Sequence, residues 1–480
     1  MVDLSSSHGL DRQHAALPAG RGFRLVSSLG NLPPLELTLG LLASVSTLIA
    51  IGALFVGVFW LNPPTHAFSI IFSGVLVLLG LALGLRQATV LVLSLLGTAR
   101  TRKSRSLGVV DQPTISILMP AYNESENVRS SIQSVLDLNY DSIELVVVDD
   151  GSSDDTYELA KPYEGVYPGR TVSVIRKANG GKSSALNLGF TLSTADFVLL
   201  IDADTQIGQN ALGEMIQHMA DPNIDAVAGQ VMVRNRGFLL TRLQALEYLI
   251  ANATIRAAQS FSGSVLLVPG PIGLFRRSAL EAVADDLRAA RGSRDQEGDE
   301  PNVVSPVSEA TFAEDFETSL RVLVNGGSIT YEPMALSETR APDKMDSLLN
   351  QRYRWIRGHL QVSRLYLKNL RSQADTKLGF WMWLTFLFDI YIMPVANVMI
   401  FLMLLIGIIL VGNIGLFLAV IAGTFLIFAS MFAYSIASQR APWTLMVVTP
   451  IFIFYQTFVL TGAYFIAVVD EVRQSKMQWN

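Results

Sequence analysis

Long apolar runs near both ends of the chain enclose a middle part in which short apolar and polar segments alternate. The first two runs, at about 35–61 and 68–96, exceed the roughly 20 residues that a helix needs to cross a bilayer core of about 30 Å. Apolar runs return at about 383–411, 414–436 and 445–469. The pattern therefore predicts a membrane protein with spanning helices at both ends of the chain.

Basic residues flank the two N-terminal runs on their outer sides. Arg12, Arg21 and Arg24 precede the first run, and a cluster from Arg100 to Arg105 follows the second. Because positive charge beside spanning helices favours the cytoplasmic face, we expect both flanks and the middle part of the chain in the cytoplasm. The number of C-terminal spans stays open at three to four, because a segment at about 378–393 is alternatively an interfacial or re-entrant helix.

The middle part repeats a strand-like run followed by a helix-like run. Short apolar runs at 115–119, 143–148, 171–175 and 197–201 are typical of strands buried on both faces, and the apolar positions at 128–136 have helical spacing. This alternation predicts an α/β domain with a mostly parallel sheet and helices on both faces. Ligands of such sheets bind beyond the carboxyl ends of the strands, and acidic residues stand at two of those ends.

Asp202 and Asp204 follow the run at 197–201, spaced two residues apart. Two carboxylates presented together at a strand end suit Mg²⁺ or Mn²⁺, which prefers a few carboxylates completed by substrate phosphates. The alternative is a solvated turn, which is the commoner origin of an isolated Asp-x-Asp. The buried strand before this pair favours the metal site.

A second acidic pair, ending in Asp150, follows the run at 143–148, and a Gly-rich turn precedes Lys182. A carboxylate at this strand end can accept a hydrogen bond from a nucleotide base or ribose, whereas a cap of the next helix is the alternative. The turn before Lys182 suits a diphosphate at a helix start. It is not the triphosphate-binding loop, because Arg176 occupies the position of that loop's first Gly.

Glu314 and Asp315 stand directly before a helix-like run at 316–324. One interpretation is that the two acids favour the N-terminus of that helix. The other is a general base, because a carboxylate held near an acceptor hydroxyl can take its proton as the hydroxyl attacks.

The segment beginning at Gln351 is rich in arginine. One interpretation is an amphipathic helix anchored to anionic lipid headgroups. The other is catalytic, with Arg354 neutralising a diphosphate leaving group and Trp355 stacking on a sugar ring. We expect both, on different faces of the helix. The basic residues concerned are Arg352, Arg354, Arg357, Arg364, Lys368 and Arg371.

Composition narrows the function classes. Half of the 480 residues are apolar, 16% are charged and the mean hydropathy is +0.38, which fits a chain partly embedded in lipid. The net charge of −5 gives no basic excess for nucleic acid. The absence of cysteine excludes disulfides, thiolate metal sites and cysteine nucleophiles.

Taken in order, these motifs resemble the processive membrane synthases of glycosyltransferase family 2, a group that includes cellulose, chitin, hyaluronan and poly-N-acetylglucosamine synthases. The resemblance covers about residues 113–371. The motifs that carry it are Pro120-Ala121-Tyr122-Asn123-Glu124, Asp149-Asp150-Gly151-Ser152, Gly181-Lys182, Asp202-Ala203-Asp204, Glu314-Asp315 and Gln351-Arg352-Tyr353-Arg354-Trp355.

The resemblance implies a GT-A catalytic domain, a UDP-sugar donor and a divalent metal ion. One departure is Ala313, which stands where the family usually has Thr, while both acids after it are kept. The resemblance implies that Tyr122, Glu124 and Asp150 bind uridine and that Lys182 and Asp202 bind the nucleotide. It implies that Asp202 and Asp204 bind the metal ion, and that Glu314 and Asp315 are catalytic, with Asp315 as the base. It also implies that Gln351, Arg354 and Trp355 contact the diphosphate and the acceptor.

The expected division of the chain follows from the apolar runs and the motifs together. It comprises a cytoplasmic tail at 1–34, two transmembrane helices at 35–98, a cytoplasmic GT-A domain at 101–345, a motif segment with an interfacial helix at 346–378, three to four transmembrane or interfacial helices at 379–469, and a tail at 470–480.

We therefore predict a processive, inverting glycosyltransferase of the plasma (inner) membrane that polymerises a UDP-sugar into a β-linked polysaccharide and exports it through its own helices. UDP-N-acetylglucosamine is the preferred donor, ahead of UDP-glucose or alternating sugars. The expected partners are the donor, the growing polysaccharide and membrane lipid, with a helper membrane subunit left open and no nucleic acid. Two alternatives remain: transfer of a single sugar to a polyprenyl phosphate or lipid, and a non-enzymatic scaffold or conduit.

Overall fold

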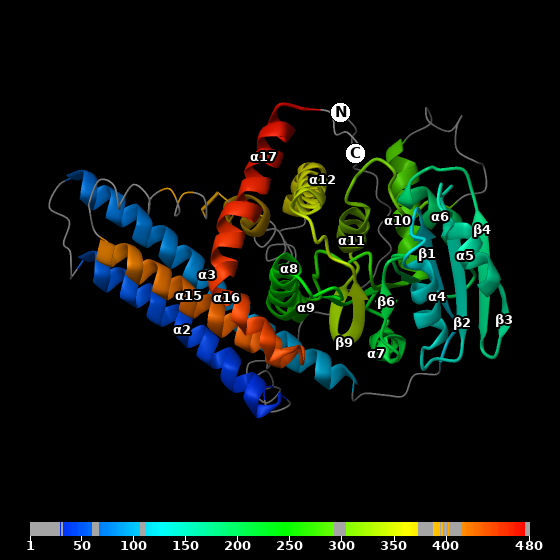
Figure 1. The fold of residues 1–480 in the computed structure, drawn as a ribbon, viewed down its shortest axis with the longest axis horizontal. Helices are drawn as coiled ribbons and strands as arrows, with labels where there is room; N and C mark the ends of the chain where they lie inside the picture. Colours follow the sequence, from blue (N-terminus) through cyan, green and yellow to red (C-terminus); the bar gives the residue numbers. More distant parts are fainter. Residues whose placement is uncertain are drawn as a thin grey trace.

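A computed structural model describes residues 32–59, 67–105, 112–291, 304–372, 387–393 and 414–475, together with Leu29 and four positions between 395 and 402. An α/β domain forms one part of the molecule, and a bundle of long apolar helices projects from its side (Figure 1). Of the predicted span at 383–411, the structure describes only 387–393 and those four positions.

One nine-stranded sheet runs through the α/β domain, in the order β3-β4-β2-β1-β5-β8-β7-β9-β6. The strands are β1 (Ile115–Ala121), β2 (Ile143–Asp149), β3 (Gly165–Tyr167), β4 (Arg170–Arg176), β5 (Phe197–Leu200), β6 (Gln206–Ile207), β7 (Ala226–Val233), β8 (Gly273–Arg276) and β9 (Ile329–Thr339). Strands β4, β2, β1 and β5 are parallel, as predicted. The second half is mixed, because β8 is antiparallel to both of its neighbours while β7 and β9 pair in parallel. The predicted α/β class and its four strands are confirmed.

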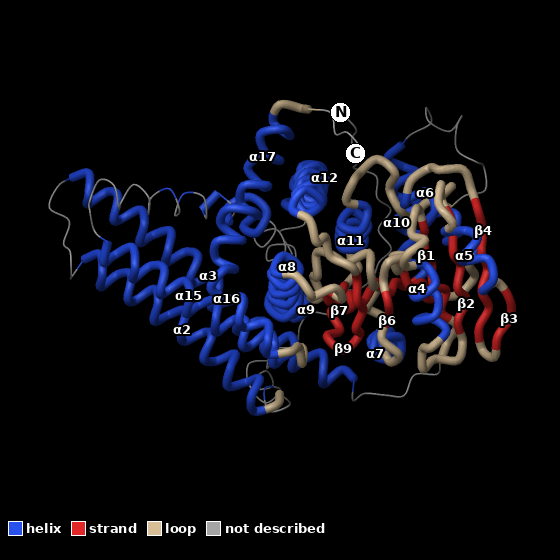
Figure 2. The backbone as a smooth tube through the Cα atoms, in the orientation of Figure 1, coloured by secondary structure: helices blue, strands red, loops and turns tan. Residues whose placement is uncertain are grey.

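Helices, blue in Figure 2, flank the red strands of this sheet. From β1 to β5 the strands and helices alternate along the chain broadly as the sequence predicts. The helices of the domain are α4 (Val128–Leu136), α5 (Thr156–Ala160), η2 (Lys161–Tyr163), α6 (Lys182–Leu192), α7 (Ala211–Ile216), η3 (Gln217–Ala220), α8 (Leu239–Ile250), the π-helical η4 (Ala251–Arg256), α9 (Ala257–Ser262), α10 (Arg277–Arg291), α11 (Glu314–Val324) and α12 (Met345–Ser372).

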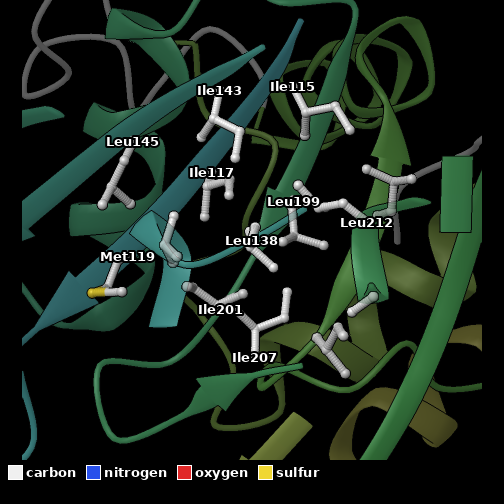
Figure 3. Close-up of a cluster of buried hydrophobic side chains, with 14 of the residues drawn as sticks. Ile115, Ile117, Met119, Leu138, Ile143, Leu145, Leu199, Ile201, Ile207 and Leu212 are labelled. Carbon is white, nitrogen blue, oxygen red and sulfur yellow. The ribbon is translucent and has the colours of Figure 1, made fainter. Parts of the chain in front are cut away.

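Alternation along the buried strands divides the core into two layers. Ile115, Ile117 and Met119 of β1 face one side and pack with side chains of β2 and β5 (Figure 3). Leu118 faces the other side and packs against α6 and its neighbours. Because successive side chains of a strand point to opposite faces, a strand with apolar residues at every position needs a helix layer on both sides. Packing on both faces therefore holds the carboxyl ends of β1, β2 and β5 in a defined position.

Three long apolar helices lie side by side in the bundle: α2 (Pro34–Phe59), α3 (Ala67–Arg105) and α15 (Ile414–Ser438) (Figure 1). Large apolar side chains on α2 and α3 are exposed, which is typical of a surface that meets lipid. Among the described residues, three stretches are long and apolar enough to cross a bilayer: Pro34–Ala53, Val77–Arg102 and Trp443–Val472.

The ends of these helices meet at a buried carboxylate, Glu36, which is 3% exposed. Arg102, near the end of α3, forms an ion pair with it at 2.7 Å, and the hydroxyl of Ser438, at the end of α15, donates to it at 2.9 Å. This end of α3 also reaches the α/β domain, since Arg100 donates to the carbonyl of Phe261 at 2.7 Å. The start of α2 and the ends of α3 and α15 therefore share the side of the bundle on which the domain lies.

The last apolar stretch leaves this bundle. It comprises η7 (Trp443–Val448), α16 (Thr449–Phe454), the π-helical η8 (Tyr455–Leu460) and α17 (Thr461–Val472). Figure 1 shows α17 crossing toward α12 rather than continuing along α15. The two ends of this stretch thus contact different elements, with its beginning packed against α8 and its end against α12.

Gly97 permits the closest approach between the bundle and the domain. A Cβ atom at this position of α3 would lie 1.9 Å from the carbonyl oxygen of Ala257 in α9. In Gly97→Ala, overpacking should cost about 1–3 kcal/mol of stability. The higher helix propensity of alanine offsets roughly 1 kcal/mol of this cost, so we expect a net loss of stability. The midpoint of thermal unfolding in detergent should fall by several degrees. Gly52→Ala is the control, since its Cβ meets nothing within 4 Å, and equal midpoints would contradict this packing.

Candidate active site

The parallel strands β1, β2 and β5 end at one edge of the sheet, and the predicted acids follow them there. Asp150 comes directly after β2 and is 2% exposed. Its carboxylate accepts hydrogen bonds from Lys177 Nζ at 2.7 Å and from the backbone N–H groups of Gly180 and Gly181 at 3.0 and 2.7 Å. Asp150 therefore shapes the Gly-rich turn that leads into α6.

The loop after β1 carries Tyr122, which is 49% exposed, and Glu124, which is half-buried. Burial raises the pKa of Glu124 to about 7; the hydrogen bond from Asn127 lowers it, and the charges of Asp204 and Asp202 raise it further. Glu124 therefore lies within the field of the aspartate pair. Uridine binding by this loop and by the residue after β2 stays a prediction.

Lys182, the first residue of α6, bridges two acidic motifs that are far apart in the sequence. Its ammonium nitrogen lies 2.7 Å from Asp202 Oδ1 and 2.9 Å from Glu314 Oε1. Burial disfavours the charged form, but the carboxylates of Asp202, Glu314 and Asp315 outweigh it and raise the pKa of Lys182 well above its usual value. The lysine is a fixed positive charge between the end of β5 and the start of α11.

Asp315 lies in the first turn of α11, as the acid pair predicts. One carboxylate oxygen accepts from the N–H of Phe316 at 2.7 Å and the other from the N–H of Gly270 at 3.3 Å. Burial raises the pKa of Asp315 to about 6; the charge of Glu314 also raises it, while Lys182 lowers it. A carboxylate with this pKa is ionised near neutral pH and basic enough to accept a proton.

Lys182, Asp202, Glu314 and Asp315 line one pocket. Four of the residues predicted as site residues line it together, from three separate parts of the chain. The lining residues are Lys182, Leu186, Leu200, Ile201, Asp202, Gly270, Val307, Glu314, Asp315 and Thr318.

The aspartate pair after β5 fits a hard divalent cation as an incomplete set of ligands. Burial raises the pKa of Asp204 and the charge of Asp202 raises it further, while hydrogen bonds from the hydroxyls of Thr205 and Thr339 lower it. A cation between two such carboxylates would relieve their repulsion. Within the described part of the chain no group of three or more His, Asp or Glu side chains makes a full metal cage. The pair therefore suits an ion whose other ligands are water and a substrate diphosphate.

The third predicted group lies on α12, which presents it beside the pocket rather than within it. Arg354 and Trp355 are exposed, and Gln351 is half-buried. None of the three lines the pocket in the described structure. The helix docks next to the Glu314-Asp315 pair through Gly358, where a Cβ atom would lie 2.8 Å from that of Ala313.

Two of the arginines expected at lipid headgroups are instead buried inside the protein. Arg352 and Arg357 are 4% and 3% exposed, and each pairs with a glutamate of another helix. The expectation of headgroup anchoring is wrong for these two residues, because neighbouring helices cover their face of α12. Arg354 and Arg364 remain exposed.

Sequence reasoning missed several residues that shape the site. Gly358 could have been noticed from the sequence. A glycine inside a helical pattern costs about 1 kcal/mol of stability relative to alanine, so its presence there indicates a close packing contact. His359, whose ring meets that of Phe316 edge-on at 4.5 Å, gave no such signal. Neither did Lys177, whose bond to Asp150 depends on the course of the chain after β4.

Comparison with known proteins agrees with this fold. Residues 116–284 match the family described as Glycosyl transferase family 2. The poly-beta-1,6-N-acetyl-D-glucosamine synthase of Staphylococcus aureus (strain COL) is 31% identical over 276 residues, which cover 57% of this chain and 61% of that protein. The synthase of the same name from Staphylococcus epidermidis is 31% identical over 264 residues, 55% of this chain and 58% of that protein.

Among solved structures, the mannosyltransferase PcManGT from Pyrobaculum calidifontis, in complex with GDP-Man and Mn²⁺, has a TM-score of 0.51 at 16% identity and covers 83% of this chain and 100% of its own. The fold is thus that of a glycosyltransferase α/β domain. Residues 116–284 therefore form a glycosyl transferase family 2 domain, in agreement with the resemblance seen in the motifs. The matches span about three fifths of the length of the curated relatives.

The contact between Gly358 and Ala313 sets the distance between α12 and the base motif. Gly358→Ala should favour the helix itself but push it away from Asp315, so that sugar transfer falls by about tenfold or more while UDP affinity is kept. Gly213→Ala, on α7, is the matched control because its Cβ meets nothing within 4 Å. Kinetic assays of both variants measure this, and equal activities would refute the positioning of α12 by Gly358.

Proposed function

We propose that this protein is a processive, inverting glycosyltransferase that polymerises a UDP-sugar into a β-linked polysaccharide. The observation that carries the proposal is the meeting of Lys182, Asp202, Glu314 and Asp315 around one pocket at the carboxyl edge of the sheet. A site for sugar transfer needs a base for the acceptor and positive charge for the leaving diphosphate, and this pocket supplies both within a few ångströms.

In the proposed reaction the acceptor hydroxyl lies beside Asp315. Its oxygen attacks the anomeric carbon of the donor, the bond from that carbon to the diphosphate oxygen breaks, and the hydroxyl proton passes to the Asp315 carboxylate. UDP leaves with the bonding electrons. Attack from the side opposite the leaving group inverts the anomeric carbon, so that an α-linked donor yields a β-linked product.

Charge that develops on the diphosphate is met by the cationic side chains of this chain. Lys182 lines the pocket, and Arg354 is exposed on α12, the helix whose Gly358 packs against Ala313. Asp202 and Asp204 would hold Mg²⁺ or Mn²⁺, which when bound supplies further neutralisation of the diphosphate. Removing one stabilising group of this kind typically costs about 10²–10³ in rate.

The names of the relatives support a polymer of N-acetylglucosamine, since both are poly-beta-1,6-N-acetyl-D-glucosamine synthases. We therefore propose UDP-N-acetylglucosamine as the donor and the growing polysaccharide as the acceptor. The apolar helices support a multi-pass protein of the plasma membrane, with the α/β domain in the cytoplasm where sugar nucleotides are made. The polymer would leave through the helices beside α12, with a helper membrane subunit as an optional partner.

Incubation of the purified protein with individual UDP-sugars tests this function. We expect a high-molecular-mass product from UDP-N-acetylglucosamine, cleaved by hydrolases specific for β-linked N-acetylglucosamine. A product with one sugar per lipid or polyprenyl phosphate would replace polymerisation by single transfer. Absence of product from every donor would favour a non-enzymatic scaffold or conduit, although such a protein does not need the four charged residues of the pocket.

Asp204→Ala should remove half of the proposed metal site. We expect UDP to bind the unmodified protein more tightly with Mn²⁺ than without it, by tenfold or more, and the variant to lose this difference. Titration of UDP with and without the metal ion measures the effect. Asp221→Ala, at an exposed turn after η3, is the control. A variant that keeps the metal dependence would remove Asp204 from this role.

The raised pKa of Asp315 predicts how activity depends on pH. The base must be deprotonated to act, so kcat/KM should be constant above about pH 7 and fall tenfold per unit below about pH 6. UDP affinity measured over the same range separates this loss from protonation of Glu124, whose pKa is about 7. An activity that stays flat down to pH 5 would contradict a base with a raised pKa.

A further inference from the structure

The face of α12 turned toward the membrane helices carries a buried arginine that the proposed mechanism does not use. Arg352 is 4% exposed, and its guanidinium forms an ion pair with Glu247 of α8 at 2.9 Å. The same Glu247 oxygen accepts a hydrogen bond from the hydroxyl of Tyr455 at 2.8 Å. Tyr455 begins η8 in the last apolar helix and is 3% exposed. One carboxylate thus joins the motif helix to a helix of the membrane part.

Two further contacts of Arg352 lead to motif residues on the same helix. Its Nη1 atom donates to the side-chain oxygen of Gln351 at 2.7 Å. Its guanidinium carbon lies 4.5 Å from the centroid of the Trp355 ring, one turn further along α12. A guanidinium over an indole face is attracted by the ring and restricts its tilt, more strongly where water is excluded. Arg352 therefore fixes two side chains that the mechanism places at the diphosphate and acceptor.

A second buried arginine on the same helix provides a natural comparison. Arg357 is 3% exposed and pairs with Glu471 of α17 at 3.1 Å. It also donates to the carbonyl of Ser475 at 2.9 Å, and its guanidinium lies over the Tyr353 ring at 5.6 Å. Arg357 therefore anchors α12 to another helix as Arg352 does, but its contacts do not include Gln351 or Trp355.

We propose that Glu247 and Arg352 are positioning residues that orient Trp355 and Gln351 for the growing chain, and that Tyr455 ties this arrangement to the last apolar helix. The proposal rests on the function proposed above. The proposal predicts an effect on how tightly the acceptor chain binds, because Arg352 contacts the Trp355 ring, which would stack on a sugar. A chain held less firmly dissociates earlier, so product length reports this role. The pocket around Lys182, which Arg352 does not line, stays as it is.

Replacing arginine by lysine separates positioning from simple anchoring. Lysine keeps the positive charge for the glutamate but loses the planar group that stacks on the indole. In Arg352→Lys we expect the mean length of the polymer made from UDP-N-acetylglucosamine to fall about tenfold, with UDP affinity and the KM for the donor changed less than twofold. In the matched variant Arg357→Lys we expect product length to change less than twofold.

Two further variants test the rest of the chain of contacts. Glu247→Gln should shorten the product as Arg352→Lys does, and Glu471→Gln should not. Tyr455→Phe, which removes a single hydroxyl group, should shorten the product by a smaller factor while leaving UDP affinity unchanged. UDP affinity also shows that each variant has folded.

The outcomes distinguish this inference from the proposed function. If the unmodified protein makes polymer and the two lysine variants give products of equal length, the positioning role of Arg352 and Glu247 is refuted while the function stands. The same holds if Arg352→Lys raises the KM for the donor and leaves product length unchanged. If the unmodified protein makes no polymer from any donor, the function fails and this inference falls with it.

Discussion

The ammonium group of Lys182 offsets the electrostatic repulsion between the carboxylates of the site. Asp202, Glu314 and Asp315 come from the end of a strand and the start of a helix, and uncompensated they would repel one another in a partly buried pocket. The lysine lies within 3 Å of the first two and lowers the pKa of the third. It thereby fixes α11 against the end of β5 and leaves Asp315 ionised near neutral pH, yet still basic.

The sequence predicts the part of this arrangement that follows from buried parallel strands. Strands β1, β2 and β5 consist of nearly continuous apolar runs, whereas β4 alternates between buried and exposed side chains. Because parallel strands share an edge, the acids after β2 and β5 had to lie near one another. The return of the chain through β8 and β7 was not predicted, because pairing direction in a mixed sheet depends on long-range packing. Gly270 reaches Asp315 only through that return.

Side chains on α12 show where sequence patterns lose information. Spacing places Arg352 and Arg357 on a basic helix, and the same spacing would serve a helix facing lipid headgroups or one buried among acids. Only the positions of α8 and α17 decide between these, since they bring Glu247 and Glu471 to the two arginines. The two sides of α12 therefore differ. One exposes Arg354 and Trp355, and the other connects the α/β domain to the apolar helices.

The central claim is that Asp315 takes the proton of the acceptor inside a donor site that does not otherwise depend on it. The most direct measurement compares UDP affinity and UDP release from UDP-N-acetylglucosamine in the unmodified protein and in Asp315→Asn. This change keeps the size of the side chain and one of its two accepted hydrogen bonds but removes its basicity. The account predicts UDP affinity within about twofold and transfer reduced by about 10² or more. Transfer at an undiminished rate in this variant would contradict it.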